Sequence, residues 1–120
     1  YAAGEQTRDF VYVKDVVKVN FFFWEHPELK GIYNCGTGHA HPFNTVAKAV
    51  LRHFNAPLEK LEYVPFPEVL KGKYQSYTQA DAAKLLAAGY DGGFTAIDQA
   101  VAEYCALLDK TGGYYLRQKD

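Results

Sequence analysis

Two groups of polar side chains have the chemistry to hold a phosphate group. Arg8 stands between a polar loop and an apolar segment, and its planar guanidinium can donate two parallel hydrogen bonds to phosphate oxygens. The segment Lys71-Gly72-Lys73-Tyr74-Gln75 combines two cations, a flexible glycine, an aromatic ring and an amide, which together suit a sugar phosphate. Alternatives remain for both: Arg8 could form an ion pair with Asp9 or Asp15, and 71–75 could be a solvated loop.

A glycine-containing turn, Gly36-Thr37-Gly38, follows a short apolar run and precedes an amphipathic helical pattern. A dinucleotide-binding turn needs a third glycine three positions later, and this chain has His41 there, followed by Pro42. We therefore expect no cofactor-binding residue at this turn. It either brings backbone close to a ligand held elsewhere or has a structural role alone.

Two further patterns could carry chemistry but lack the necessary surroundings. Tyr115 and Lys119 have the spacing of a dehydrogenase acid/base pair, yet they follow two glycines near the chain end with no cofactor-binding strand beside them. Cys35, His39 and His41 could bind a metal, but a structural zinc site needs a second pair of ligands, which is missing. We expect no catalytic residue and no metal site in this chain.

The elements that must position these residues predict an α/β fold with about four helices and three short strands. Apolar runs predict the strands at 10–13, 32–35 and 61–64. Helical periodicity and start or stop signals predict the helices at 15–26, 43–54, 78–89 and 95–112. Asp15 is the expected N-cap of the first helix, and the residues Thr78 to Asp81 resemble a capping box before the third. The aromatic run at 21–24 covers most of the first helix, so one side should pack on something outside this chain.

Composition limits the classes of function. The 120 residues have single-domain length, and 48% of them are hydrophobic, which allows a real core. A net charge of −1 gives no basic face for nucleic acid, and no apolar run is long enough to span a membrane. Two cysteines seventy residues apart indicate reduced thiols and a cytoplasmic protein. Because the chain has no methionine and opens on Tyr1, we expect a piece of a longer protein that lacks its N-terminal portion.

Two motifs resemble a known enzyme family. RDFVYVKDV at 8–16 and GIYNCGTG at 31–38 resemble the C-terminal portion of extended short-chain dehydrogenase/reductases, the NAD-dependent nucleotide-sugar epimerases and dehydratases. The segment EYVPFPEVLKGKYQSYTQADAAKLLAAGYD at 62–91 is similar to the ADP-L-glycero-D-manno-heptose 6-epimerases, which act in lipopolysaccharide core precursor synthesis. The match runs from about Arg8 to Asp109. PFP, KGKYQ and TQAD in this order are its most specific parts.

The resemblance implies a division of labour between this chain and a longer parent enzyme. Residues 1–120 would form one substrate-binding C-terminal domain, with the last elements packing on a Rossmann sheet that lies in the missing N-terminal domain. That missing domain would bind NADP and supply the catalytic tyrosine and lysine, which transiently oxidise and re-reduce C6″. Arg8 would contact the pyrophosphate of the ADP-sugar, and Tyr74 would contact the substrate near the same group. The parent enzyme would be a cytoplasmic homo-oligomer, and this chain alone would be inactive.

Two alternatives stay open at this point. The parent could be another nucleotide-sugar epimerase or dehydratase of the same superfamily, or the chain could be a non-catalytic binding or interaction domain. No role follows for Lys71, Lys73 or Gln75. Relatives usually have a serine cap where this chain has Pro42, so we also expect the helix from Phe43 to have a frayed start.

Overall fold

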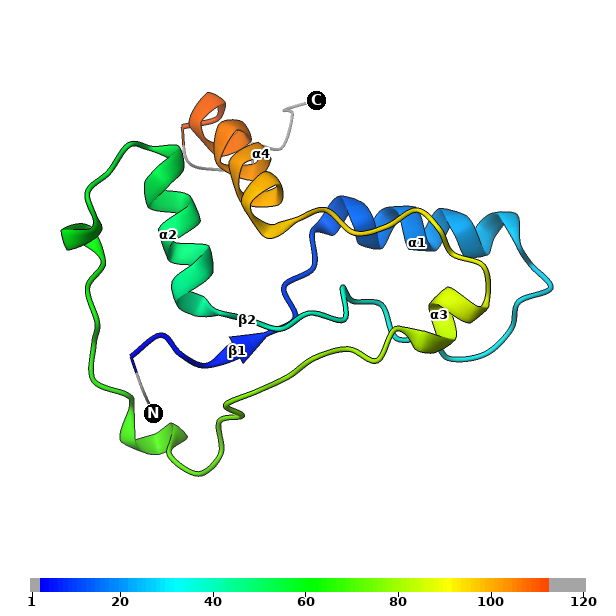
Figure 1. Cartoon of the computed structure of the whole chain (residues 1–120), viewed down its shortest axis with the longest axis horizontal. Coiled ribbons are helices and arrows are strands. Elements are labelled where there is room, and N and C mark those ends of the chain that lie inside the picture. Colours follow the sequence, from blue (N-terminus) through cyan, green and yellow to red (C-terminus); the bar gives the residue numbers. More distant parts are fainter. Residues whose placement is uncertain (1–2, 113–120) are drawn as a thin grey trace, which may run out of the picture.

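The computed structural model describes residues 3–112 as four helices and a two-stranded sheet (Figure 1). The order of elements along the chain is β1 (Thr7–Arg8), α1 (Val13–Glu25), β2 (His41–Pro42), α2 (Phe43–His53), the 3₁₀ turns η1 (Leu58–Lys60) and η2 (Glu68–Leu70), α3 (Ala83–Ala87) and α4 (Ile97–Lys110). The α/β fold class and the four predicted helices are therefore confirmed.

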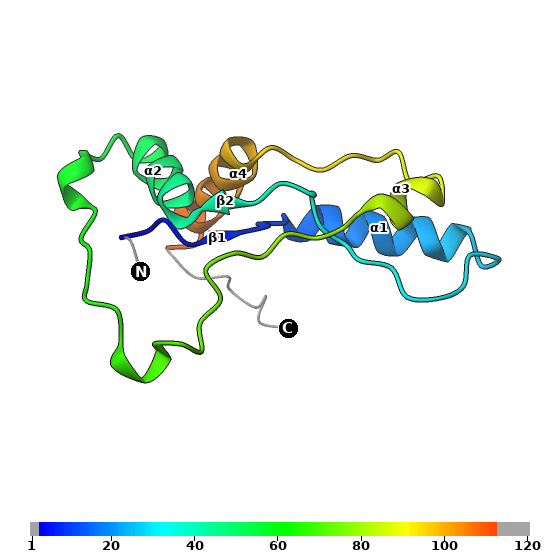
Figure 2. The same ribbon diagram turned by 60° about the horizontal axis from the view of Figure 1, so that its bottom comes forward.

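The helices form two pairs that a short sheet joins. In both views α2 lies beside α4, and α3 lies beside α1 (Figures 1 and 2). Strand β1 runs antiparallel to β2, with Thr7 opposite Pro42 and Arg8 opposite His41. Thr7 also forms a parallel bridge with Tyr77, so a third segment lies against β1. The long connection from α2 to α3 swings away from the helices and returns to this point (Figure 2).

The positions of the predicted strands are wrong. Residues 10–12 belong to no strand and Val13 already begins α1, while 32–35 and 61–64 also contain no strand. A strand exists only when a neighbouring backbone accepts and donates its hydrogen bonds, and the described part of the chain offers these three segments no such neighbour. The two strands that do form lie at positions without an apolar run, because pairing rather than hydrophobicity defines them.

The helix starts depend on contacts that are distant in sequence. Asp15 is not the N-cap of α1, which begins at Val13; its carboxylate is fully buried and accepts hydrogen bonds from Thr95. The start of α2 is not frayed, because the first two amides of the helix donate to carbonyl groups of the N-terminal loop: Phe43 N to Gln6 O at 3.1 Å and Asn44 N to Gly4 O at 3.1 Å.

The third helix is shorter than predicted. The expected capping box does not start it, because the amide of Thr78 donates to Thr7 O and so belongs to the bridge beside β1. Asp81 Oδ1 instead accepts a bond from the amide of Ala83, the first residue of α3. The predicted stop is confirmed, since Gly89 follows the helix with φ of +98°, a conformation that favours glycine.

The hydrophobic core is smaller than the composition suggests. Val19 of α1, Leu85 of α3 and Tyr90 are buried together, with Phe22 and Phe94 packed on them. The radius of gyration is 17.3 Å, against about 13–14 Å for a compact domain of this length. The aromatic run of α1 is divided accordingly: Phe22 and Phe23 face this core, whereas Phe21 and Trp24 are exposed by 62% and 83%.

Candidate functional site

Arg8 lies at the point where the sheet meets the long connection, and its side chain is held in place. Its Nη1 donates to its neighbour's carbonyl, Thr7 O, at 2.7 Å, and its Nη2 donates to Gln75 O at 2.5 Å. These two bonds fix the plane of the guanidinium and leave its other N–H groups for a further acceptor. Neither ion pair considered for Arg8 is found, because the carboxylates of Asp9 and Asp15 both bind other groups.

Tyr74 meets Arg8 although 66 positions separate them in the sequence. The guanidinium carbon lies 4.8 Å from the centroid of the Tyr74 ring and 5.9 Å from that of Phe43. Phe66 packs edge-on against Tyr74 with 5.5 Å between ring centroids. A guanidinium that lies over an aromatic face is stabilised by the cation–π interaction and can still donate hydrogen bonds from its remaining N–H groups to a phosphate or carboxylate.

A pocket of about 470 Å³ opens beside Tyr74. Aromatic and apolar residues line most of it, the acidic Glu62 is its one charged lining residue, and Arg8 lies outside the lining. The lining residues include Gly4, Gln6, Phe43, Asn44, Tyr63, Phe66 and Tyr74. Its polar groups are ordered: Tyr63 Oη donates to Asn44 Oδ1 at 2.9 Å, and Asn44 Nδ2 donates to Ala3 O at 3.1 Å. The volume lies in the range of about 300–1,000 Å³ that is usual for small-molecule sites.

The turn at Gly36-Thr37-Gly38 is used inside the protein. The amides of Thr37 and Gly38 both donate to the carboxylate of Asp9, at 2.9 Å each, and the Thr37 hydroxyl donates to the same carboxylate at 2.6 Å. Burial alone would raise the pKa of Asp9, but these bonds and one from the Ala80 amide outweigh burial and lower the pKa below its usual value. The amides that would have to cradle a dinucleotide phosphate are thus bound to an internal carboxylate, and the turn does not fit that role.

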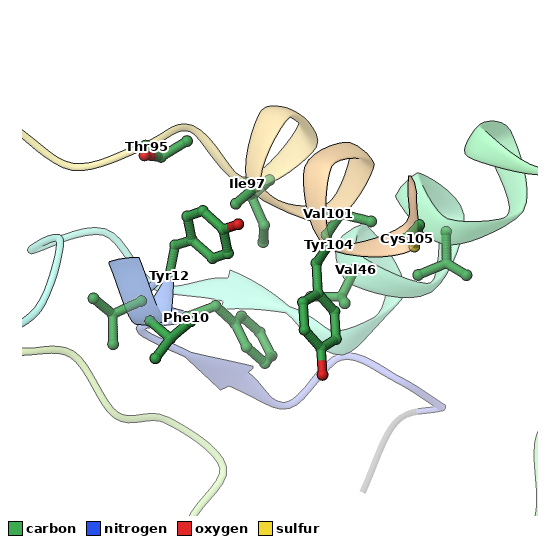
Figure 3. Close-up of a pocket in the computed structure, with 12 residues that line it drawn as sticks. Phe10, Tyr12, Val46, Thr95, Ile97, Val101, Tyr104 and Cys105 are labelled. Atoms are coloured by element: carbon green, nitrogen blue, oxygen red, sulfur yellow. The ribbon is translucent and has the colours of Figure 1, made fainter. Parts of the chain in front are cut away.

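A second pocket of about 480 Å³ lies between α2, α4 and the residues that lead into α1. Figure 3 shows its walls, which are formed by apolar and aromatic side chains including Phe10, Tyr12, Val46, Ile97, Val101 and Tyr104. The one threonine in the wall, Thr95, already donates its hydroxyl to Asp15. No charged residue lines this pocket, so it suits an apolar ligand. The pocket at Tyr74 also has no cation among its lining residues, but there the guanidinium of Arg8 lies over the ring of one of them, Tyr74.

The remaining candidates from the sequence do not form sites. Lys71 pairs with Glu68 at 2.5 Å within its own loop, and Gln75 contributes its backbone carbonyl rather than its amide. Across residues 3–112 no three His, Cys, Asp or Glu side chains lie close enough to hold a metal, so Cys35, His39 and His41 do not form one. Tyr115 and Lys119 lie outside the described residues. No described helix is both long and apolar enough to cross a membrane.

Asp9 and Asn44 are the residues that sequence reasoning missed. The sequence suggests Asp9 only as a possible ion-pair partner of Arg8, whereas in the fold its carboxylate organises the turn at 36–38. Asn44 lies on the first turn of α2 and joins Tyr63 to the N-terminal loop. No spacing rule in the sequence marks either contact, because each joins segments that only the fold brings together.

Comparison with known families supports the resemblance to the epimerase/dehydratase family and does not reach the narrower resemblance to heptose 6-epimerases. Residues 1–36 match the NAD dependent epimerase/dehydratase family. The matched part includes Arg8, Asp9 and Gly36, and it ends before the loop that carries Tyr74. The match supports an enzyme parent of the epimerase/dehydratase type that uses a nicotinamide cofactor.

Proposed function

We propose that this chain is the substrate-binding part of a nucleotide-sugar epimerase in which Arg8 and Tyr74 hold the diphosphate of the substrate. The observation that carries this proposal is the guanidinium of Arg8, which two carbonyl groups fix in place and whose carbon lies over the Tyr74 ring, 4.8 Å from its centroid. The adjoining aromatic pocket of about 470 Å³ is suited to the nucleoside. The family match over residues 1–36 supports the reaction class.

The substrate in this proposal is ADP-L-glycero-D-manno-heptose, and the reaction is inversion at C6″ in lipopolysaccharide core precursor synthesis. The similarity of the segment 62–91 to enzymes with this activity supports the choice. A preceding domain would bind NADP, which accepts and returns the hydride, and would carry the catalytic groups. The parent enzyme would be a cytoplasmic homo-oligomer, and this chain would be inactive alone.

The role of this chain would be to bind and orient the substrate. Arg8 would donate hydrogen bonds to the diphosphate oxygens, while the Tyr74 ring stabilises the cation on one face of the guanidinium. Because the guanidinium is already bonded to Thr7 and Gln75, little side-chain freedom would be lost on binding. Fixing the diphosphate would then fix the direction in which the bound sugar extends out of the pocket.

Titration of the 120-residue chain with ADP-L-glycero-D-manno-heptose in a calorimeter tests the proposal. Arg8→Ala should weaken binding roughly 10- to 100-fold, since a charge-assisted hydrogen bond is worth about 1.5–3 kcal/mol. Arg8→Lys should recover only part of the affinity, because lysine keeps the charge and loses the fork. Arg52→Ala is the matched control: Arg52 pairs with Asp98 between α2 and α4, and its loss should leave binding unchanged.

The same assay separates the alternatives. Tighter binding of a UDP- or dTDP-sugar would assign the chain to another epimerase or dehydratase, and equal affinity for wild type and Arg8→Ala would refute the diphosphate assignment. In the parent enzyme, Arg8→Ala should raise KM for the ADP-sugar far more than it affects NADP retention. A parent that binds the ADP-sugar but turns over no nucleotide sugar would favour a non-catalytic binding domain.

A further inference from the structure

We infer that Asp9 is a positioning residue for the diphosphate site: its carboxylate fastens to β1 the segment that carries Tyr74 and Gln75. This inference rests on the proposed function of Arg8. Asp9 accepts four hydrogen bonds from two distant segments. Oδ1 accepts from the amide and hydroxyl of Thr37, at 2.9 and 2.6 Å, and Oδ2 accepts from the amides of Gly38 and Ala80, at 2.9 and 3.1 Å.

The bond from Ala80 connects Asp9 to the diphosphate site. Besides the bond from Arg8 to Gln75 O, residues 7–9 are bound to the segment 74–80 at three points: Thr7 N donates to Ser76 O at 2.9 Å, Thr78 N donates to Thr7 O at 3.2 Å, and Ala80 N donates to the Asp9 carboxylate. Only the last of these depends on a side chain. Without it the segment keeps the two backbone bonds at its middle and loses the bond at its end, so Gln75 O and the Tyr74 ring are less firmly held against Arg8.

The closeness of the turn to Asp9 gives independent support. A β-carbon built on Gly36 would lie 2.5 Å from the Ala80 β-carbon and 2.9 Å from Asp9 Oδ2. Glycine is therefore needed at position 36 because backbone, carboxylate and Ala80 meet there without room for a side chain. Thr37 adds its hydroxyl to the same carboxylate, so every acceptor direction of Asp9 is directed at these two segments.

Asp9→Asn tests the inference because it preserves shape and replaces one acceptor oxygen by an NH₂ group that faces amide donors. The probe is ADP-glucose, whose diphosphate is a diester, and binding to the 120-residue chain is measured for wild type, Asp9→Asn, Arg8→Ala and the double variant. We expect Asp9→Asn to weaken binding about 10-fold in the wild-type background and less than about 2-fold in the Arg8→Ala background, the coupling shown by residues that act through one another. Asp81→Asn is the matched control, because it replaces a carboxylate that accepts one hydrogen bond from an exposed amide, and it should leave ADP-glucose binding unchanged.

Each outcome decides a separate question. The inference fails in two cases: if Arg8→Ala weakens binding and Asp9→Asn does not, or if Asp9→Asn weakens binding equally in both backgrounds. In either case Asp9 does not hold Tyr74 and Gln75 in place for the diphosphate site. If Arg8→Ala leaves binding unchanged, the proposed function itself fails, and this inference fails with it. Should Asp9→Asn not fold, Thr37→Val removes the hydroxyl that donates to Asp9 and also accepts from the amide of His39. This variant should weaken ADP-glucose binding, whereas Thr37→Ser, which keeps both bonds, should bind like wild type; equal affinities for these two variants would overturn the inference.

Discussion

Replacing Asp15 by asparagine should destabilise the protein strongly at neutral pH and much less in acid. Asp15 has no exposed surface and accepts three hydrogen bonds: Thr95 N at 2.7 Å, Thr95 Oγ1 at 3.0 Å and Lys18 Nζ at 2.9 Å. The two bonds from Thr95 join α1 to the segment that leads into α4, across 80 positions of sequence. Asparagine keeps the shape but offers one acceptor oxygen instead of two.

The magnitude follows from the bonds that are lost. Asparagine can still accept from one donor of Thr95, while its NH₂ group faces the other, which stays buried without an acceptor. An unsatisfied buried donor costs about 1–3 kcal/mol, and loss of the charge weakens the remaining bonds. We therefore expect a loss of about 2–4 kcal/mol in the free energy of unfolding. Lys18→Ala should cost far less, because the Lys18 side chain is 54% exposed and water replaces its ion pair.

The pH dependence gives the prediction its sharper test. Burial would raise the pKa of Asp15, but hydrogen bonds from Lys18 and Thr95 outweigh burial and lower the pKa below its usual value of 3.8. A lowered pKa in the folded state means that the carboxylate stabilises the fold above about pH 4, and that this contribution is lost as the pH falls through the folded-state pKa. The difference between wild type and Asp15→Asn should therefore be constant from pH 7 to about pH 5 and shrink below about pH 4.

Urea denaturation followed by circular dichroism measures both quantities. With a slope of about 1–3 kcal/mol per molar urea, the expected loss at pH 7 lowers the midpoint by on the order of 1–2 M. Thr95→Ser, which keeps both donors, is the control and should denature close to wild type. A midpoint shift below about 0.3 M at pH 7, or one that stays the same in acid, would refute the reasoning, since a purely steric effect of asparagine would not depend on protonation.

Two further predictions concern the glycine turn and the thiols. Gly36→Ala should destabilise the protein more than Gly72→Ala in the same urea assay, because its β-carbon would lie 2.5 Å from that of Ala80, whereas Gly72 has open space and only its φ of +73° to oppose a side chain; equal midpoints would contradict this. Burial raises the pKa of both Cys35 and Cys105, so both thiols should react slowly with a disulfide reagent at pH 7, and Cys105, which is 5% exposed, should be the slower; fast reaction of Cys105 would show that α4 opens readily.

The helices were predictable and the strands were not, for different physical reasons. The second helix, α2, has its apolar residues at helical spacing, and its predicted range of 43–54 agrees with the observed Phe43–His53 to one residue. Such a helix needs only its own backbone for hydrogen bonds, so its sequence contains most of the information. A strand needs a second backbone to pair with, and an apolar run in the sequence does not show which segment that will be. The sheet formed at Thr7–Arg8 and His41–Pro42 because those backbones meet.

The residues that signal a helix start are recognised from their near neighbours in the sequence alone. This explains why some predicted helix starts are wrong. Asp15 and Thr95 are residue types that favour the N-cap position, and the sequence predicts that each starts its own helix. In the fold they bind one another instead, which satisfies a buried carboxylate and a backbone amide with one contact. A capping residue is a short polar side chain near a free amide, and the same chemistry serves any amide that the fold brings within reach.

The dipeptide Arg8-Asp9 shows how much can be predicted from neighbouring residues alone. Neighbours of opposite charge invite the prediction of an ion pair, yet successive side chains of an extended chain point to opposite sides. Arg8 therefore faces Gln75 and the Tyr74 ring, while Asp9 faces the turn at 36–38. That alternation alone disfavours the ion pair without any structure. The identity of the groups on each side required the fold, because 66 positions separate Arg8 from Tyr74 and nothing in their spacing relates them.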